Sequence, residues 1–165
     1  MLFNSFAFLF AFLPLALGLH WLVERFAPVW RLPLLLVLSL AFYAYWDWRF
    51  LPLLMDLILD NWLVAEGFQK TRSGALITAA FVANLLLLAL FKYFNFFGDL
   101  AAMIPGLPAP KLDLALPLGI SFFTFHHVMY LTDLRRGQAP RYDLVRYGLY
   151  IAFFPQVLAG PLVRW

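Results

Sequence analysis

Two adjacent histidines, His126 and His127, lie in the stretch SFFTFHHVMYLTDLRRG among mostly aromatic and aliphatic residues. An imidazole can serve as a general base, and an ionisable side chain kept at membrane depth generally has a partner or a function there. Neighbouring residues point about 100° apart on a helix, so the two rings face different directions. His126 shares its face with Tyr130 and Asp133, which predicts a chain of hydrogen-bonding groups.

Two interpretations of this histidine pair remain open. Each ring can stay neutral and hydrogen-bond a neighbouring helix, as polar residues do between membrane helices. Alternatively one ring, His126 before His127, lines a polar tunnel or contacts a substrate. The face of His126 is expected to begin at Gly119 and Phe123. The candidate tunnel- or substrate-lining residues are His126, His127, Tyr130, Asp133, Ser121, Thr124 and Gln156.

Thr124 and His127, one turn apart, are the arrangement closest to a nucleophile with its base. A hydroxyl becomes nucleophilic when a base takes its proton, and a third group from another element orients that base. Side chains at i and i+3 project in parallel, and the sequence supplies no clear third member. We therefore expect no complete catalytic site in this chain, and no metal site.

Asp56 and Asp60 lie four residues apart in LPLLMDLILDNWLVAEGF and so share one helical face. Like charges in this relation repel by roughly a few tenths of a kcal/mol, and two ionised carboxylates in lipid need a cation or water. A proton or cation path is one interpretation, and bonding between helices or exposure at the interface is the other. Asn61, Asn84 and Asn95 are most simply bonded between helices.

The composition is that of a membrane protein. Of 165 residues, 64% are hydrophobic and 13% are charged, whereas soluble domains have about 25% charged residues. The net charge of +3 comes from basic residues between apolar runs, which indicates membrane topology and no nucleic-acid partner. Because the chain has no cysteine, it cannot form a disulfide or carry an acyl group as a thioester.

Six apolar segments predict an all-α fold, a polytopic transmembrane helical bundle in which residues 1–165 form a single domain. The segments cover residues 6–23, 32–46, 50–64, 75–97, 117–134 and 144–158. A straight span needs about 20 residues, so the second, third and sixth are expected to be tilted, broken or re-entrant. The first segment lacks the features of a signal peptide, which predicts that it is retained.

Basic residues alternate between the connections of these segments. The richly basic connections hold Arg25, Arg31, Lys70, Arg72, Arg135, Arg136, Arg141 and Arg146, whereas the others hold Arg49 and Lys111. Cytoplasmic loops carry the excess of Lys and Arg, so the N-terminus is predicted to lie outside and those eight residues in the cytoplasm. The loop 98–116 contains three prolines, cannot be helical throughout, and is placed on the outer face.

The last segment, GLYIAFFPQVLAGPLVRW, contains Pro155 within its apolar run. A mid-helix proline frees a carbonyl one turn earlier, near Ile151, and that carbonyl needs a partner in a membrane. Gln156 is placed to supply one. A kink without a further role and a broken helix that shapes a cavity wall remain alternatives.

Three stretches, in their order and spacing, resemble the start of a bacterial membrane-bound O-acyltransferase of the alginate and peptidoglycan O-acetylation branch. They are FYAYWDWRFL, LFKYFNFF, and LPLGISFFTFHHVMYLTDLRRG followed by FFPQVLAGPLVR. The resemblance covers essentially the whole chain and implies the N-terminal half of that fold. This chain departs from the pattern in its third segment, where Asn61-Trp62 replaces the common Asn-Tyr followed shortly by Gly.

The resemblance implies acyl transfer across the bacterial cytoplasmic (inner) membrane. A cytoplasmic acyl thioester such as acetyl-CoA would enter a tunnel, and the acyl group would pass to a hydroxyl of an exported polysaccharide or its periplasmic acceptor protein. It also implies an exported SGNH-type acetyltransferase as partner and no cofactor bound to this chain. The catalytic histidine is expected beyond Trp165, so this N-terminal fragment alone would be inactive, and neither His126 nor His127 matches that histidine.

Two other classes of function remain open from the residues. One is a small membrane transporter or channel subunit that uses Asp56, Asp60 and His126 as a polar pathway. The other is a non-catalytic assembly protein. Further apolar segments with a buried histidine downstream would favour the enzyme, and an inverted repeat of these six segments would favour the transporter.

Overall fold

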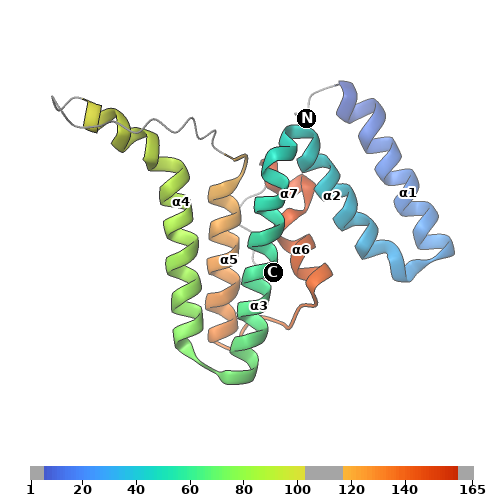
Figure 1. Ribbon diagram of the computed structural model, residues 1–165. Helices are drawn as coiled ribbons and strands as arrows, with labels where there is room; N and C mark the ends of the chain where they lie inside the picture. Colours follow the sequence, from blue (N-terminus) through green and yellow to red (C-terminus); the bar gives the residue numbers. More distant parts are fainter. Residues whose placement is uncertain (1–5, 103–116, 160–165) are drawn as a thin grey trace. The chain divides into compact units, whose positions relative to one another are not determined.

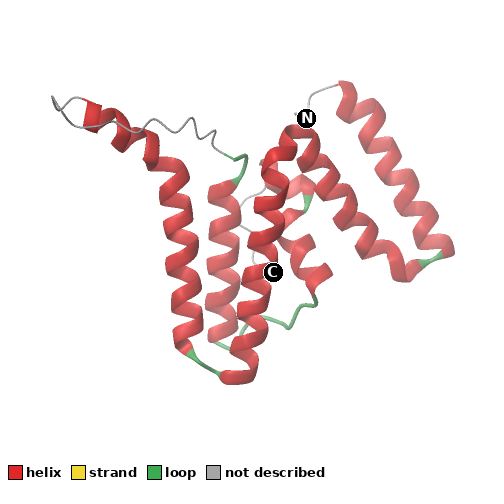
Figure 2. Cartoon of the chain, viewed as in Figure 1, coloured by secondary structure: helices red, strands yellow, loops and turns green. Residues whose placement is uncertain are grey.

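The computed structural model describes residues 6–102 and 117–159, with side chains placed over 6–94 and 117–156. This described part is helical and contains no strand, so the all-α prediction is confirmed (Figure 2). Its helices group into two compact units. Among the described residues, the first unit comprises 6–63 and 140–159 and the second comprises 64–102 and 117–139.

The helix α2, Arg31–Asp47, is the central element of the first unit. It contacts α1 (Leu13–Phe26), α6 (Leu144–Ala152) and α7 (Phe154–Ala159) (Figure 1). A π-helical turn, η1 (Phe8–Phe12), runs directly into α1. The short 3-10 turns η2 (Pro28–Trp30) and η3 (Trp48–Phe50) lead into α2 and into α3, which spans Leu51–Thr71.

Aromatic rings form the buried core of the first unit. Phe8, Phe42 and Phe154 are buried together, with Phe12, Leu13 and Phe153 packed against them. The Phe12 and Phe154 rings meet edge to face with centroids 5.3 Å apart, a geometry that aromatic pairs prefer. This cluster joins the start of the chain, α2 and α7, which are far apart in sequence.

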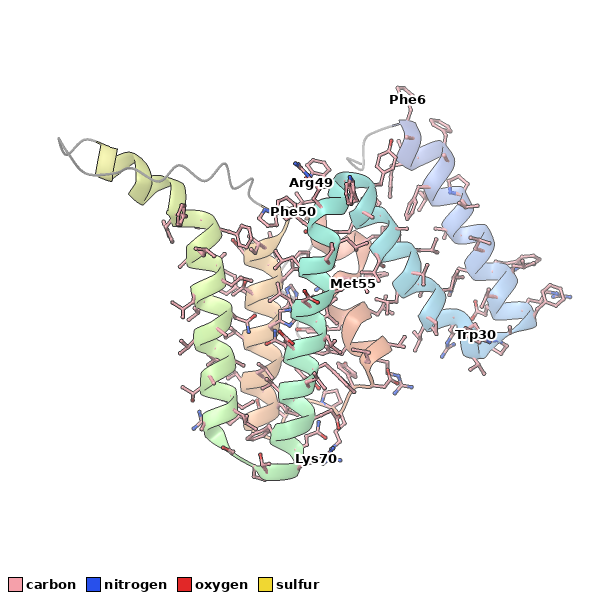
Figure 3. All side chains as sticks on the ribbon, viewed as in Figure 1. Phe6, Trp30, Arg49, Phe50, Met55 and Lys70 are labelled. Carbon is pink, nitrogen blue, oxygen red and sulfur yellow. The ribbon has the colours of Figure 1, made fainter. Side chains whose placement is uncertain are left out.

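The turn between α2 and α3 is closed by Asp47 and Arg49, the latter labelled in Figure 3. The carboxylate of Asp47 accepts hydrogen bonds from the Arg49 backbone N–H at 3.0 Å, from its Nε at 2.9 Å and from its Nη2 at 2.7 Å. A bidentate guanidinium–carboxylate pair of this kind has a well-defined geometry. The two polar residues between the second and third apolar segments therefore form a local turn.

The second unit contains the end of α3 from residue 64, α4 (Gly74–Ala102) and α5 (Ile120–Arg135). Figure 1 shows α5 beside α4, and these two helices are in contact. Arg72 and Ser73 form the short turn between α3 and α4, where the Arg72 N–H donates to the Phe68 carbonyl at 2.7 Å. The apolar runs around the "QKTRSG" connection thus become two helices joined by a turn of two residues.

Three stretches of described helix are long and apolar enough to cross a membrane: Phe8–Phe26, Pro28–Thr71 and Gly74–Phe94. The second stretch, of 44 residues, contains both α2 and α3, which have 17 and 21 residues. With 16 and 9 residues, α5 and α6 rise about 24 and 14 Å, less than the ~30 Å hydrocarbon core of a bilayer. The expected count of about six spans is not confirmed.

Several predicted boundaries are wrong. Because α3 continues to Thr71, the third segment is not short, and because α4 continues to Ala102, the loop predicted over 98–116 starts too early. An apolar run shows where a helix can meet lipid, but a helix extends past it through good helix formers such as Ala, Glu, Gln and Lys. The prolines of that loop lie outside the described residues. The sixth segment is broken, as expected.

Candidate functional site

The helix α5 carries six of the seven candidate residues. It begins at Ile120 because Gly119 takes a left-handed backbone conformation, φ 73°, which glycine adopts without strain. The Phe123 N–H donates to the Gly119 carbonyl at 2.9 Å and closes the first turn. The prediction that Gly119 lies on the helical face of His126 is therefore wrong, since its own backbone is not helical.

Both polar faces of α5 are buried. The buried residues include Phe123, His126, Tyr130 and Asp133 on one face and Thr124 and His127 on the next. Ser121 is half-buried, while Phe122 and Phe125 point outward. Most polar side chains of α5 are thus enclosed while Phe122 and Phe125 are exposed, which is the arrangement expected of a helix whose outer side meets lipid.

The ring of His126 is held by its own helix. Its Nδ1 lies 2.8 Å from the carbonyl oxygen of Phe122, one turn back. A carbonyl oxygen only accepts, so Nδ1 carries the proton, and in the neutral ring Nε2 is the unprotonated nitrogen. The bond therefore fixes both the tautomer of His126 and the direction of its basic nitrogen.

His126, Tyr130 and Asp133 share one buried face, as their spacing requires. Asp133 lies where α5 ends, and its backbone carbonyl accepts from the N–H groups of Gln138 at 2.8 Å and Ala139 at 3.2 Å. The structure therefore places these three residues together as buried side chains, while the hydrogen-bonded chain predicted along the face stays a prediction. The use of this face to line a tunnel or contact a substrate also stays a prediction.

Thr124 and His127, the pair closest to a nucleophile and base, are almost fully enclosed. The exposed fraction is 1% for Thr124 and 0% for His127. A nucleophile has to be reached by its substrate. In this arrangement the pair suits contacts between helices better than chemistry.

The break between α6 and α7 depends on Ser39, a residue that the sequence reasoning missed. Ser39 Oγ donates to the Leu35 carbonyl at 2.8 Å and accepts from the Phe154 N–H at 3.3 Å. Phe154 begins α7, and the first N–H groups of a helix have no acceptor within it. Ser39, 1% exposed, supplies that acceptor at a buried point.

Gln156 lies in the first unit, in the first turns of α7. The expectation of a proline in mid-helix is wrong: α6 ends at Ala152, and Pro155 falls where a missing N–H leaves no helical bond unmade. The Gln156 N–H donates to the Phe153 carbonyl at 2.9 Å. An open pocket of about 430 Å³ is lined by Leu32, Leu35, Tyr142, Arg146, Leu149, Tyr150, Phe153 and Gln156.

Asp56 and Asp60 are both exposed on α3. Asp56 also borders a groove of about 250 Å³, whose other lining residues are Leu36, Leu40, Met55, Ile58, Leu59, Leu144 and Gly148. Gly148 permits the close approach behind this groove, since a Cβ there would lie 3.2 Å from Leu36 Cδ1 and 3.6 Å from Ile58 Cγ2. The groove is therefore apolar apart from one carboxylate.

Two of the asparagines expected to bond between helices use a carbonyl of their own helix. Asn61 Nδ2 donates to the Leu57 carbonyl at 2.9 Å, and Asn84 Nδ2 donates to the Ala80 carbonyl at 2.8 Å. Both side chains are buried. This local bond partly satisfies a polar group at membrane depth. The side chain of Asn95 lies outside those described.

Over the described ranges, no group of three or more His, Asp or Glu side chains is arranged to hold a metal ion. Two residues important to the architecture, Ser39 and Gly148, were not singled out from the sequence. A lone hydroxyl inside an apolar run and a lone glycine inside an apolar helix are the signals that could have found them.

The chain is similar over its whole length to bacterial O-acetylases. It is 37% identical over 176 residues to the "Probable alginate O-acetylase AlgI" of Azotobacter vinelandii, with 100% of this chain and 34% of that protein covered. The protein of the same name from Pseudomonas aeruginosa is 34% identical, with 100% and 33% covered. The peptidoglycan O-acetyltransferase of Helicobacter pylori is 32% identical, with 99% and 37% covered.

These relatives confirm the resemblance drawn from the sequence to membrane O-acyltransferases of this branch. The chain spans about a third of their length, less than the half that the resemblance implied. No protein-family model matches the chain. No solved structure is significantly similar to it.

Proposed function

Because the chain is homologous over its whole length to bacterial O-acetylases, we propose that it is part of an integral-membrane O-acyltransferase. The proposed reaction moves an acyl group, most simply acetyl, to hydroxyls of an exported polysaccharide or to its periplasmic acceptor protein. One observation carries the proposal: relatives named for two different polymers, alginate and peptidoglycan, match the entire chain. O-acetyl transfer is what those names share.

An acyl thioester such as acetyl-CoA is the proposed donor, on the cytoplasmic side. The acceptor oxygen attacks the acyl carbonyl carbon, a histidine takes the hydroxyl proton, and the C–S bond breaks to release the thiol. Since the chain has no cysteine, the acyl group is not held on it as a thioester. The general base is proposed to lie outside these 165 residues.

The proposed role of this chain is to form part of the wall of the donor tunnel. The row of buried polar groups on α5 supports this role, because such groups are costly in lipid and suit a polar passage. Within that row, Nε2 of His126 is the nitrogen suited to accept a hydrogen bond, because Nδ1 donates to Phe122. Packing against another helix is the alternative use of the same residues.

The protein is proposed to lie in the bacterial cytoplasmic membrane with its N-terminus outside. The alternation of basic connections supports this orientation, and the exposed apolar side chains of α1 and α4 fit a lipid bilayer. An exported SGNH-type acetyltransferase is proposed as the protein that receives the acyl group. The polysaccharide is then the final acceptor.

Complementation tests the proposed activity. The complete protein should restore base-labile acetate on the exported polysaccharide of a strain that lacks it, and membrane vesicles from that strain should transfer label from acetyl-CoA. Vesicles with the empty vector are the control. The proposal would be refuted if the protein were present at normal levels but the acetate content of the polysaccharide stayed unchanged and the polymer stayed unlabelled.

The tunnel role of α5 has its own test in the complete protein. If His126 lines the tunnel, His126→Ala should lower acetylation more than His127→Ala at matched expression and thermal stability. Equal losses of activity, accompanied by poor folding of both variants, would assign the two rings to helix packing instead.

A further inference from the structure

Four basic side chains, which we call the basic end, lie at one end of the second unit. They are Lys70 in the last turn of α3, Arg72 in the turn that follows, and Arg135 and Arg136 at the end of α5. All four are exposed. Figure 1 shows the α3–α4 turn beside this end of α5, and Figure 3 labels Lys70 there.

Backbone geometry holds the basic end together. A Cβ on Gly74 would lie 3.7 Å from Nη2 of Arg135, so that guanidinium lies against the first residue of α4. The end of α5 is a Schellman motif, in which the N–H of Gly137 bonds the Leu134 carbonyl at 3.1 Å and the N–H of Gln138 bonds the Asp133 carbonyl at 2.8 Å. This motif fixes the turn that carries the two α5 arginines.

Within residues 6–94 and 117–156, none of these four side chains forms an ion pair. Elsewhere in the same ranges, Arg49 pairs with Asp47 at 2.7 Å and Arg146 with Asp143 at 3.6 Å. Like charges brought together repel each other, and an anion relieves that repulsion. The basic end therefore has the chemistry of an anion site.

Arg72 occupies a backbone conformation suited to glycine. Its φ is 55°, in the left-handed region where a Cβ is strained, and its N–H closes the end of α3 on the Phe68 carbonyl. Side chains held in such conformations cluster at binding sites, where the surrounding structure offsets the strain. This arginine lies two residues before the start of α4.

The position of the basic end along the apolar helix α4 indicates which kind of anion it binds. The apolar stretch Gly74–Phe94 begins two residues after Arg72, so these cations lie where an apolar span meets the lipid headgroups. The N-terminus of α4 adds its partial positive charge at the same place. We propose that the basic end binds the phosphodiester headgroup of an anionic membrane lipid, such as phosphatidylglycerol. This proposal does not depend on the acyltransferase activity.

Neutralising two of the arginines tests the proposal. The complete protein would be placed in nanodiscs that contain phosphatidylglycerol and phosphatidylcholine, and the lipids that it retains would be measured by native mass spectrometry. Each basic residue near a membrane surface contributes about fivefold, so Arg72→Gln with Arg135→Gln should lower the selectivity for phosphatidylglycerol about 30-fold. Arg25→Gln with Arg31→Gln removes the same charge where two other apolar stretches end, outside the basic end, so this control measures general charge attraction and should lower the selectivity clearly less than the Arg72/Arg135 pair.

A second variant separates binding from folding. Arg72→Gly removes the strain of a side chain in the left-handed backbone conformation, so the melting temperature of this variant should be no lower than that of the parent protein. Its selectivity for phosphatidylglycerol should nevertheless fall about fivefold. Equal losses in the Arg25/Arg31 control would show general charge attraction and overturn the site. Displacement of the lipid by millimolar inorganic phosphate would overturn the lipid assignment in favour of a soluble phosphate. Unchanged selectivity in folded Arg72→Gln/Arg135→Gln would also refute the proposal.

Discussion

Ser39→Ala should destabilise the protein at the break between α6 and α7. The hydroxyl of Ser39 accepts a hydrogen bond from the Phe154 N–H, which lies at the start of α7 and has no acceptor in its own helix. Alanine removes this acceptor but preserves the helix α2. The substitution therefore leaves a buried N–H without a partner.

The expected size of the effect follows from burial and geometry. Polar contacts between membrane helices contribute about 0.6 kcal/mol on average, whereas an unsatisfied buried donor costs about 1–3 kcal/mol. Ser39 is 1% exposed and Phe154 is 8% exposed, so water cannot replace the hydroxyl. At 3.3 Å the bond is longer than the ~2.9 Å typical of N–H···O bonds, which favours the lower end of the range. We expect a loss of about 1 kcal/mol.

Equilibrium unfolding of the complete protein in detergent measures this loss. Thr132→Ala is the matched control, because Thr132 Oγ1 donates to the Val128 carbonyl of its own helix, and its removal should stay within about 0.5 kcal/mol. Ser39→Thr keeps the oxygen and should restore most of the stability. If Ser39→Ala proves no more harmful than Thr132→Ala, the assigned role of Ser39 is wrong.

Three further outcomes are expected. Gly148→Leu should lower the free energy of unfolding by about 1–3 kcal/mol, because a Cβ at Gly148 would lie only 3.2 Å from Leu36 Cδ1. Gly18→Leu is the control and should be nearly neutral, since a Cβ at Gly18 would have nothing described within 4 Å. Equal shifts in melting temperature for the two variants would contradict this. Reporter fusions at Ser73 and Gln138 should both report the cytoplasm, and periplasmic activity at either would reverse the orientation. The 165-residue chain expressed alone should give background transfer of labelled acetyl, and turnover would place the active site within it.

The helices themselves could be predicted because apolar runs and the residues that interrupt them are local signals. Asp47 and Arg49 show this well: two polar residues between apolar runs predicted a connection, and their own ion pair closes it. The residues at which the helices begin and end could be predicted less well. The end of α3 at Thr71 is set by backbone hydrogen bonds, which continue beyond the apolar residues. The grouping of the helices into two units depends on contacts between distant segments, which hydropathy does not encode.

The candidate site was predictable to the extent that it rests on helical spacing. His126, Tyr130 and Asp133 share a buried face because they are four and three residues apart. The helix that packs against α5 could not be predicted, because the contact with α4 joins segments that are distant in the chain.

Partners of polar groups are the part that the sequence leaves undetermined. A histidine or serine in an apolar run signals that a hydrogen bond exists, since an unsatisfied polar group is costly in a membrane. It does not identify the other atom. His126 uses a carbonyl four residues away, whereas Ser39 receives an N–H from 115 residues further along the chain. The first bond follows from the helix alone, but the second requires α2, the end of α6 and the start of α7 to meet, and only the folded chain determines that meeting.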